Sequence, residues 1–134
     1  MVYELSLTRN PISIGPPAAA SAPNYSEAAA HGAVISFLGV VRCSENGSRI
    51  GGLEYSAFED MARHQFIKLF DQASRQWPIH SIRLIHRLGP VRAGDTSLWV
   101  EVTTAHRGEA FAACQWIIDQ MKQVVPIWKK AIPE

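Results

Sequence analysis

Three of the four lysines in the chain lie within nine residues of one another, at Lys122, Lys129 and Lys130. Lys122 follows Cys114 and Ile118 at helical spacing, so we expect it at the border of an apolar stripe. There a lysine can lay its stem on the core and present its amine in a cleft, where desolvation and nearby cations would favour a nucleophile or proton acceptor. Spacing alone favours the alternative that Lys122 only complements the dipole of a helix end.

The segment Thr103 to Arg107 joins a predicted strand to a predicted helix. A helix N-terminus carries free N–H groups and the positive end of the helix dipole, which attract anions. Arg107 adds a guanidinium group that suits phosphate or carboxylate, and His106 can donate a hydrogen bond or a proton. Arg42 stands in a similar place, where a predicted buried strand enters a loop. All three are candidate anion-binding residues, although a solvated loop or the polar end of a strand would have the same pattern.

The remaining titratable side chains carry weaker signals. Cys43 follows Arg42, but no histidine or aspartate stands at a motif spacing from it, so we interpret it as a loop thiol. Cys114 belongs to a helical apolar stripe and His86 to the apolar face of a strand, so we expect both in the core. The other histidines lack metal-ligand spacing, and the sequence predicts no metal site and no bound cofactor.

Length and composition limit the classes of protein to consider. The 134 residues suit one domain spanning 1–134. The net charge of +1 offers no field that would recruit nucleic acid. The sequence contains no run of about 18 apolar residues, so no membrane-spanning helix is predicted. The first residues lack the pattern of a signal peptide. We therefore expect a cytoplasmic protein that binds neither nucleic acid nor membrane.

Hydrophobic periodicity predicts two long helices, at about Asp60–Trp77 and Gly108–Val124. Apolar or alternating runs predict strands at Tyr3–Thr8, Ala33–Val41, Leu53–Phe58, Ser81–Leu88 and Ser97–Thr104. Tight turns between neighbouring strands favour an antiparallel or mixed sheet with both helices packed on one face, an α+β fold.

The connecting segments have less regular patterns. Ile14 to Ser26 is rich in proline and alanine and is typical of a loop, with a short helix predicted after it at Ser26–His31. Arg42–Gly52 is predicted to be a flexible loop or a wide hairpin. Gly89-Pro90 is interpreted as a turn, and Ile127–Lys130 as a tail.

Several segments of the chain stand together in a specific order: GAVISFLGVVR (Gly32–Arg42), LEYSAFEDMA (Leu53–Ala62), IHRLGPVRAGD (Ile85–Asp95), AHRGEAFAACQWIIDQMK (Ala105–Lys122) and PIWKK (Pro126–Lys130). With these segments the chain resembles the catalytic large subunit of molybdopterin synthase over roughly Gly32 to Lys130. The resemblance implies the α/β-hammerhead fold of that family, which agrees with the α+β interpretation.

The resemblance also implies a sulfur-transfer reaction. The family converts cyclic pyranopterin monophosphate into molybdopterin, inserting two sulfurs as a dithiolene during molybdenum cofactor biosynthesis. A small ubiquitin-like subunit brings the sulfur as a thiocarboxylate on its C-terminal Gly-Gly end. Two large subunits form a central homodimer with one small subunit at each outer end, a heterotetramer. Because the sulfur is delivered, the large subunit needs no cysteine nucleophile.

Residue by residue, the resemblance assigns the essential lysine to Lys122 and a second catalytic lysine to Lys129. It assigns substrate binding to Val40, Val41, Arg42, His106, Arg107, Lys122, Lys129, Lys130 and Ala131. Ala131 departs from the family, because many members carry an acidic residue there and continue into a longer tail. Cations converging on one cleft would hold the substrate phosphate and the partner's negative tail in attack geometry.

Two other functions fit the same residues. The short C-terminal end and Ala131 leave open a non-catalytic platform that grips a ubiquitin-like partner. A third hypothesis is an unrelated acyl transferase that uses Lys122 or Cys43. Conversion of the pterin by the chain and its thiocarboxylated partner would distinguish the sulfur-transfer function from the non-catalytic platform and from the acyl transferase.

Overall fold

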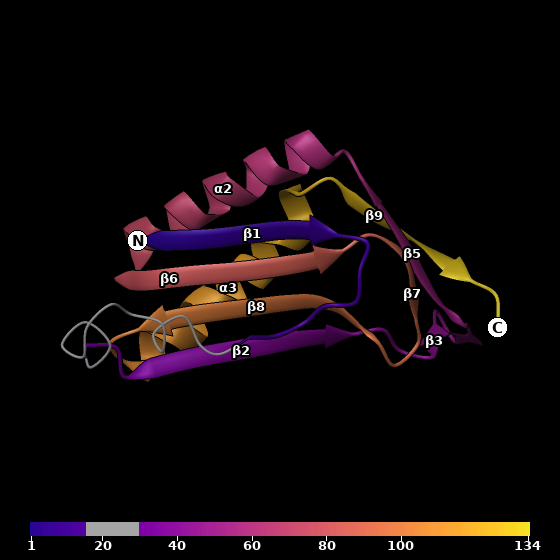
Figure 1. Ribbon diagram of the computed structural model, residues 1–134, viewed down its shortest axis with the longest axis horizontal. Helices are drawn as coiled ribbons and strands as arrows, with labels where there is room; N and C mark the ends of the chain where they lie inside the picture. Colours follow the sequence, from indigo (N-terminus) through magenta and orange to yellow (C-terminus); the bar gives the residue numbers. More distant parts are fainter. Residues whose placement is uncertain (16–29) are drawn as a thin grey trace.

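The computed structural model describes residues 1–15 and 30–134 (Figure 1). Their element order is β1 (Val2–Thr8), β2 (Ala33–Val40), β3 (Ser44–Glu45), β4 (Ser48–Arg49), β5 (Gly52–Ala57), α2 (Glu59–Gln76), β6 (Ile79–Arg87), β7 (Gly89–Arg92), β8 (Thr96–Thr104), α3 (Arg107–Val124) and β9 (Ile127–Ile132). Both predicted long helices and all the predicted strands are present, with ends shifted by one or two residues. In this described part, no helix is long and apolar enough to span a membrane.

A four-stranded sheet with the strand order β1-β6-β8-β2 forms the centre of the fold. β1 runs parallel to β6, whereas β8 is antiparallel to both β6 and β2. Both helices lie on one face of this sheet (Figure 1). α2 packs on β1 and β6, α3 packs on β2 and β8, and the helices contact each other. The prediction of an α+β fold with two helices on a mixed sheet is therefore confirmed.

The core between helices and sheet contains the apolar stripes that the periodicity predicted. Phe66, Phe70 and Ile117 are each 0% exposed. Burying a side chain of this size stabilises the fold by about 1.5–3 kcal/mol. Cys114 lies in the same core, as predicted, and burial raises the pKa of its thiol to about 11.

A second sheet, with the strand order β7-β5-β9, stands at one end of the first (Figure 1). Two predictions are wrong here. Gly89-Pro90 begins strand β7, and Ile127–Lys130 belongs to strand β9 instead of a free tail. Both strands pair with β5, which is distant from them in the sequence. Such short strands depend on cross-strand contacts, which a local pattern does not reveal.

The segment Arg42–Gly52 is a hairpin in which β3 pairs with β4. Asn46 and Gly47 make its turn, with φ angles of 51° and 82°. Most of the loop predicted for Ile14 to Ser26, and most of the helix predicted at Ser26–His31, fall outside the described residues. Ala30 and His31, which are described, lie in a turn and an irregular segment.

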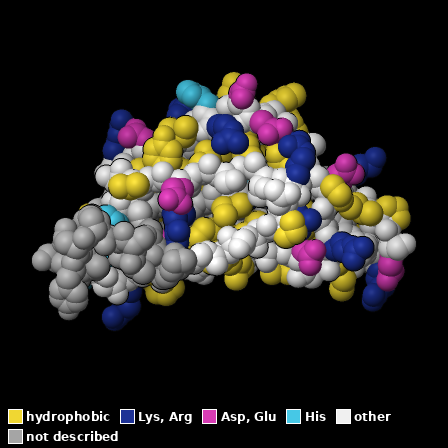
Figure 2. All heavy atoms as spheres, in the orientation of Figure 1, with side chains coloured by type: hydrophobic (Ala, Val, Ile, Leu, Met, Phe, Trp, Pro, Cys, Tyr) yellow, Lys and Arg dark blue, Asp and Glu magenta, His cyan; other side chains and the backbone are white. Residues whose placement is uncertain are grey.

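Charged side chains of both signs are scattered over the face of the molecule that Figure 2 shows. This mixture agrees with the net charge of +1. Anion binding must therefore come from the local placement of a few cations and not from the field of the whole protein.

Candidate active site

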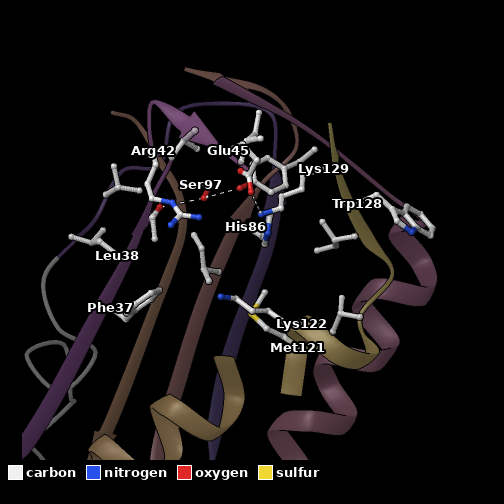
Figure 3. Close-up of a pocket in the computed structure, with 18 residues that line it drawn as sticks. Phe37, Leu38, Arg42, Glu45, His86, Ser97, Met121, Lys122, Trp128 and Lys129 are labelled. Atoms are coloured by element: carbon white, nitrogen blue, oxygen red, sulfur yellow. Dashed lines mark hydrogen bonds and ion pairs between the residues drawn. The ribbon is translucent and has the colours of Figure 1, made fainter. Parts of the chain in front are cut away.

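A pocket of about 630 Å³ opens where the two sheets meet the C-terminal end of α3 (Figure 3). Its volume lies in the range of small-molecule sites. The walls come from the end of β2, from β5, β8 and β9, and from the last turn of α3, and they include the apolar side chains of Phe37, Met121 and Trp128. Among residues 1–15 and 30–134, no group of three histidine, cysteine or acidic side chains is placed to hold a metal ion.

Three cations point into this pocket from three separate segments (Figure 3). Arg42 follows β2, Lys122 lies in the last turn of α3, and Lys129 lies on β9. All three side chains are exposed to solvent. Because like charges repel, their convergence is most stable with an anion between them. The geometry is therefore that of an anion site with an apolar wall.

The backbone that presents Arg42 is held by the turn before β8. The N–H of Val41 donates to the carbonyl of Asp95 at 3.0 Å, and the N–H of Gly94 donates to the carbonyl of Val41 at 2.7 Å. Gly94 has a φ of 93°, a left-handed conformation that favours glycine. Val41 is buried and Val40 is exposed, and both line the pocket. These contacts set the direction in which Arg42 leaves the strand.

The position of Lys122 is set by Met121, the residue before it. Met121 is 6% exposed, and its carbonyl accepts the N–H of Val125 at 3.0 Å, which closes the helix. Lys122 therefore leaves the border of the apolar stripe toward the pocket, as the spacing predicted. Its side chain is exposed, however, so the desolvation invoked for a nucleophilic amine is absent while the pocket is open.

Lys129 has an acidic neighbour that the sequence did not indicate. Its amine lies 3.5 Å from a carboxylate oxygen of Glu45, which is half-buried on β3 and lines the pocket. The tight hairpin turn folds Glu45 back toward β9. Ion pairs this long and this exposed contribute about 0–1 kcal/mol. An incoming anion can therefore replace Glu45 as the partner of Lys129.

Polar groups on the core side of the pocket were also missed. The Tyr55 hydroxyl donates to Ser97 Oγ at 3.4 Å, and the Ser97 hydroxyl donates to the carbonyl of Gly39 at 3.2 Å. The His86 ring meets the Tyr55 ring edge-on, with centroids 5.1 Å apart. His86 is 5% exposed, which confirms the predicted core histidine, but it also borders the pocket. In the sequence, His86 stood in an apolar stripe and in the segment Ile85–Asp95, and neither singled it out for the pocket.

His106 and Arg107 lie at the opposite end of α3. His106 is the N-cap and Arg107 the first helical residue, whereas Lys122 is in the last turn. A helix of 18 residues is about 27 Å long, so these two side chains cannot reach the pocket of their own chain. The expectation that all the cations converge on one cleft is therefore wrong for this pair within one chain, although it holds for the three cations described above.

Two further predicted binding residues lie on β9 outside the pocket. Lys130 is opposite Glu54 and Ala131 is opposite Leu53 in the pairing with β5, and both are exposed. Alternation along the strand sends Lys129 toward the pocket and Lys130 to the other side. Neither Lys130 nor Ala131 lines the pocket, so their assignment to substrate binding stays a prediction.

Comparison with known proteins identifies the family of this chain. The family model described as MoaE protein matches residues 7–124. The molybdopterin synthase catalytic subunit of Vibrio cholerae serotype O1 is 39% identical over 101 residues, which are 75% of this chain and 67% of the relative. The chain belongs to the MoaE family.

Solved structures named for molybdopterin synthesis share the fold of this MoaE chain. Molybdopterin synthase from Staphylococcus aureus has a TM-score of 0.79 at 29% identity, over 96% of this chain and 90% of that chain. A complex of subunits 1 and 2 of molybdopterin-converting factor from Helicobacter pylori has a TM-score of 0.67 at 24% identity, over 99% of this chain and 90% of that chain. The predicted family, and with it the prediction of an enzyme subunit of molybdenum cofactor biosynthesis, is confirmed.

Proposed function

We propose that this chain inserts two sulfurs into cyclic pyranopterin monophosphate to form the dithiolene of molybdopterin. The sulfur arrives as a thiocarboxylate on the C-terminal Gly-Gly end of a small ubiquitin-like subunit. The convergence of Arg42, Lys122 and Lys129 on one pocket is the observation that carries this proposal. We also propose that residues 1–134 act as one domain and that the protein works in the cytoplasm.

Two anions must meet in the pocket for this reaction. The substrate carries a phosphate, and the partner's tail ends in a negative thiocarboxylate. A pair of opposite charges about 4 Å apart attracts by roughly 4 kcal/mol in a partly solvated site, so separate cations can hold two anions that repel each other. Holding both reactants in place also turns a bimolecular step into an intramolecular one.

We assign the chemical step to Lys122 and substrate-anion binding to Lys129 and Arg42. When the substrate and the tail bind, they displace water from the pocket. The amine of Lys122, which is solvated while the pocket is open, is then desolvated. Lys129 exchanges Glu45 for a substrate anion.

The remaining assigned residues have secondary roles. Val40 and Val41 form an apolar wall beside the bound substrate. Because Lys130 and Ala131 lie beyond the pocket, we assign them only to contacts with a partner that extends past its rim.

A homodimer would bring His106 and Arg107 to the pocket of the neighbouring chain. Both are exposed at the N-terminus of α3, a place that attracts anions. β2 is the outer strand of its sheet and runs from that end of the molecule to the pocket. Its side chains Val34 and Leu38 are 36% and 46% exposed, an apolar edge suited to a second copy. Antiparallel pairing of two β2 strands would put His106 and Arg107 of each chain near Arg42 of the other.

Reconstitution with the purified small subunit tests the reaction. The wild-type chain with thiocarboxylated partner should convert the pterin, and Lys122→Ala should reduce kcat by about 10²-fold or more. Lys68→Ala, on the exposed side of α2, is the matched control and should keep the wild-type rate. Full activity of Lys122→Ala would reject its assigned role. Tight complex formation without any conversion by the wild type would favour the non-catalytic platform.

Mixed dimers test the arrangement across two chains. Lys122→Ala and Arg107→Ala chains are each expected to be weakly active alone. After subunit exchange, random pairing makes half of the dimers mixed, and each mixed dimer has one intact site. The mixture should therefore recover about one quarter of the wild-type rate. Exchange without recovery would contradict the shared site.

A further inference from the structure

His86 is a buried titratable side chain that the roles above do not use. It continues the stripe of Ile82 and Leu84 on the side of β6 that faces the helices, where those two are 0% and 1% exposed. A leucine would extend that stripe equally well. The position of His86 is different because the core opens there into the same pocket that Lys122 and Lys129 line.

One hydrogen bond determines the tautomer of the His86 ring. Nδ1 lies 2.8 Å from the backbone carbonyl of Arg87, which can only accept, so Nδ1 carries the proton. In the neutral ring, Nε2 is then an acceptor with a free lone pair. Within the described residues Nε2 has no hydrogen-bond partner, and it is not among the polar atoms enclosed without one. Nε2 therefore meets the open space of the pocket.

The surroundings keep this ring neutral near pH 7. Burial lowers the pKa of His86 from its usual 6.5, and the bond to the Arg87 carbonyl opposes this only in part. The titratable groups that share the pocket come from every neighbouring element: Arg42 after β2, Glu45 on β3, Tyr55 on β5, Lys122 on α3 and Lys129 on β9. Cations outnumber carboxylates among them, which also disfavours an imidazolium.

Sulfur transfer from a thiocarboxylate requires a proton acceptor. Once the sulfur is bonded to the substrate carbon, its bond to the carbonyl carbon of the tail must break. Water supplies the replacement: a C–O bond forms, the C–S bond breaks, and the sulfur stays on the substrate as a thiolate. The tail becomes a carboxylate, and the water loses one proton as it attacks and a second from the resulting acid. No oxidant or reductant is needed.

We propose that Nε2 of His86 accepts the proton of the attacking water, which makes His86 a further catalytic residue. The inference rests on the proposed function. The residues of the pocket then have separate roles, because the cations hold the anions and the neutral imidazole activates the water. The edge-on contact with Tyr55, whose hydroxyl is tied through Ser97 to the backbone, holds the ring in this orientation.

The test uses the reconstituted enzyme with its thiocarboxylated partner. His86→Asn keeps a donor for the Arg87 carbonyl but lacks Nε2. We expect it to retain the wild-type circular dichroism spectrum and to lower kcat by about 10²-fold, with KM nearly unchanged. Added imidazole should restore part of the rate of His86→Ala. His64→Asn, exposed on α2, is the matched control and should keep the wild-type rate.

Wild-type turnover by His86→Asn would overturn the inference. A second measurement needs no variant. Nitrogen-15 NMR of the wild-type enzyme should show a neutral His86 with its proton on Nδ1 at pH 7, and an imidazolium or a proton on Nε2 would also overturn it. Lack of turnover by the wild type would reject the proposed function itself, whereas wild-type turnover with an active His86→Asn rejects only the role of His86.

Discussion

The face of the four-stranded sheet opposite the helices and the pocket contain similar ion pairs in different settings. Arg83 and Glu101, which alternate with the core residues of β6 and β8, form a bidentate pair on that outer face, with two N–O distances of 2.9 Å and side chains that are 15% and 3% exposed. At the pocket, Lys129 and Glu45 are 3.5 Å apart and 52% and 21% exposed. The first pair is held by short bonds away from water, and the second remains open to exchange with another anion.

The core and the pocket also contain buried titratable groups that differ in this way. Cys114 is enclosed by apolar side chains, and His86 lies where the core opens. Burial disfavours the charged form of each, so it raises the pKa of the thiol and lowers the pKa of the imidazole. A buried polar group therefore stabilises the fold where protein atoms surround it completely. It can take part in chemistry where one of its hydrogen-bonding atoms is left facing a ligand.

The largest effect on stability is expected from breaking the ion pair between Arg83 and Glu101. Glu101→Gln removes the buried carboxylate that accepts two short hydrogen bonds from Arg83, so the free energy of unfolding should fall by about 3–5 kcal/mol. Urea unfolding measures this loss. The sulfur-transfer rate per folded molecule should not change, because the pair lies outside the pocket.

A double variant is the control for this prediction. Arg83→Met combined with Glu101→Leu leaves no buried charge and should recover much of the lost stability. A loss below about 1 kcal/mol in Glu101→Gln would show that the pair of Arg83 and Glu101 behaves like an exposed one.

A smaller effect is expected at alkaline pH from Cys114. The pKa of its thiol is about 11 in the folded chain and 9.0 without burial. Below pH 9 both states hold the proton, and above it the unfolded state loses the proton first, so stability falls as pH rises toward 11. The loss should reach about 2–3 kcal/mol and be absent from Cys114→Ala, which starts from a lower stability at pH 7. Cys43→Ala removes an exposed thiol and should show the wild-type loss. Identical alkaline losses in all three proteins would contradict the prediction.

The smallest effect on stability is expected at the open ion pair. Glu45→Gln should change the free energy of unfolding by less than about 1 kcal/mol. Because Lys129 then has no competing carboxylate, KM for the pterin should fall by about two- to fivefold. Glu59→Gln breaks another exposed pair, with Arg9, and should leave KM unchanged. An unchanged KM in Glu45→Gln would show that Glu45 does not compete with the substrate.

Predictions from the sequence succeeded where the cause is local. The stripes of the two helices, the alternation of β6 and the burial of Cys114 follow from residues a few positions apart, and all were predicted. Strands β7 and β9 were missed because each depends on pairing with β5. Glu45 was missed for a related reason, since its contact with Lys129 joins residues far apart in the sequence.

By itself, the sequence determined the family, the α+β class and which side chains are candidates for chemistry, because residue types at short spacings carry that information. Tertiary structure alone decided which of those candidates share a pocket. It brought Arg42, Lys122 and Lys129 together and added Glu45 and His86, which the sequence did not indicate as residues of the site. It also placed His106 and Arg107 a helix length away. The physical reason is that a helix is a rigid spacer, so residues on one segment of sequence can lie at opposite ends of the fold.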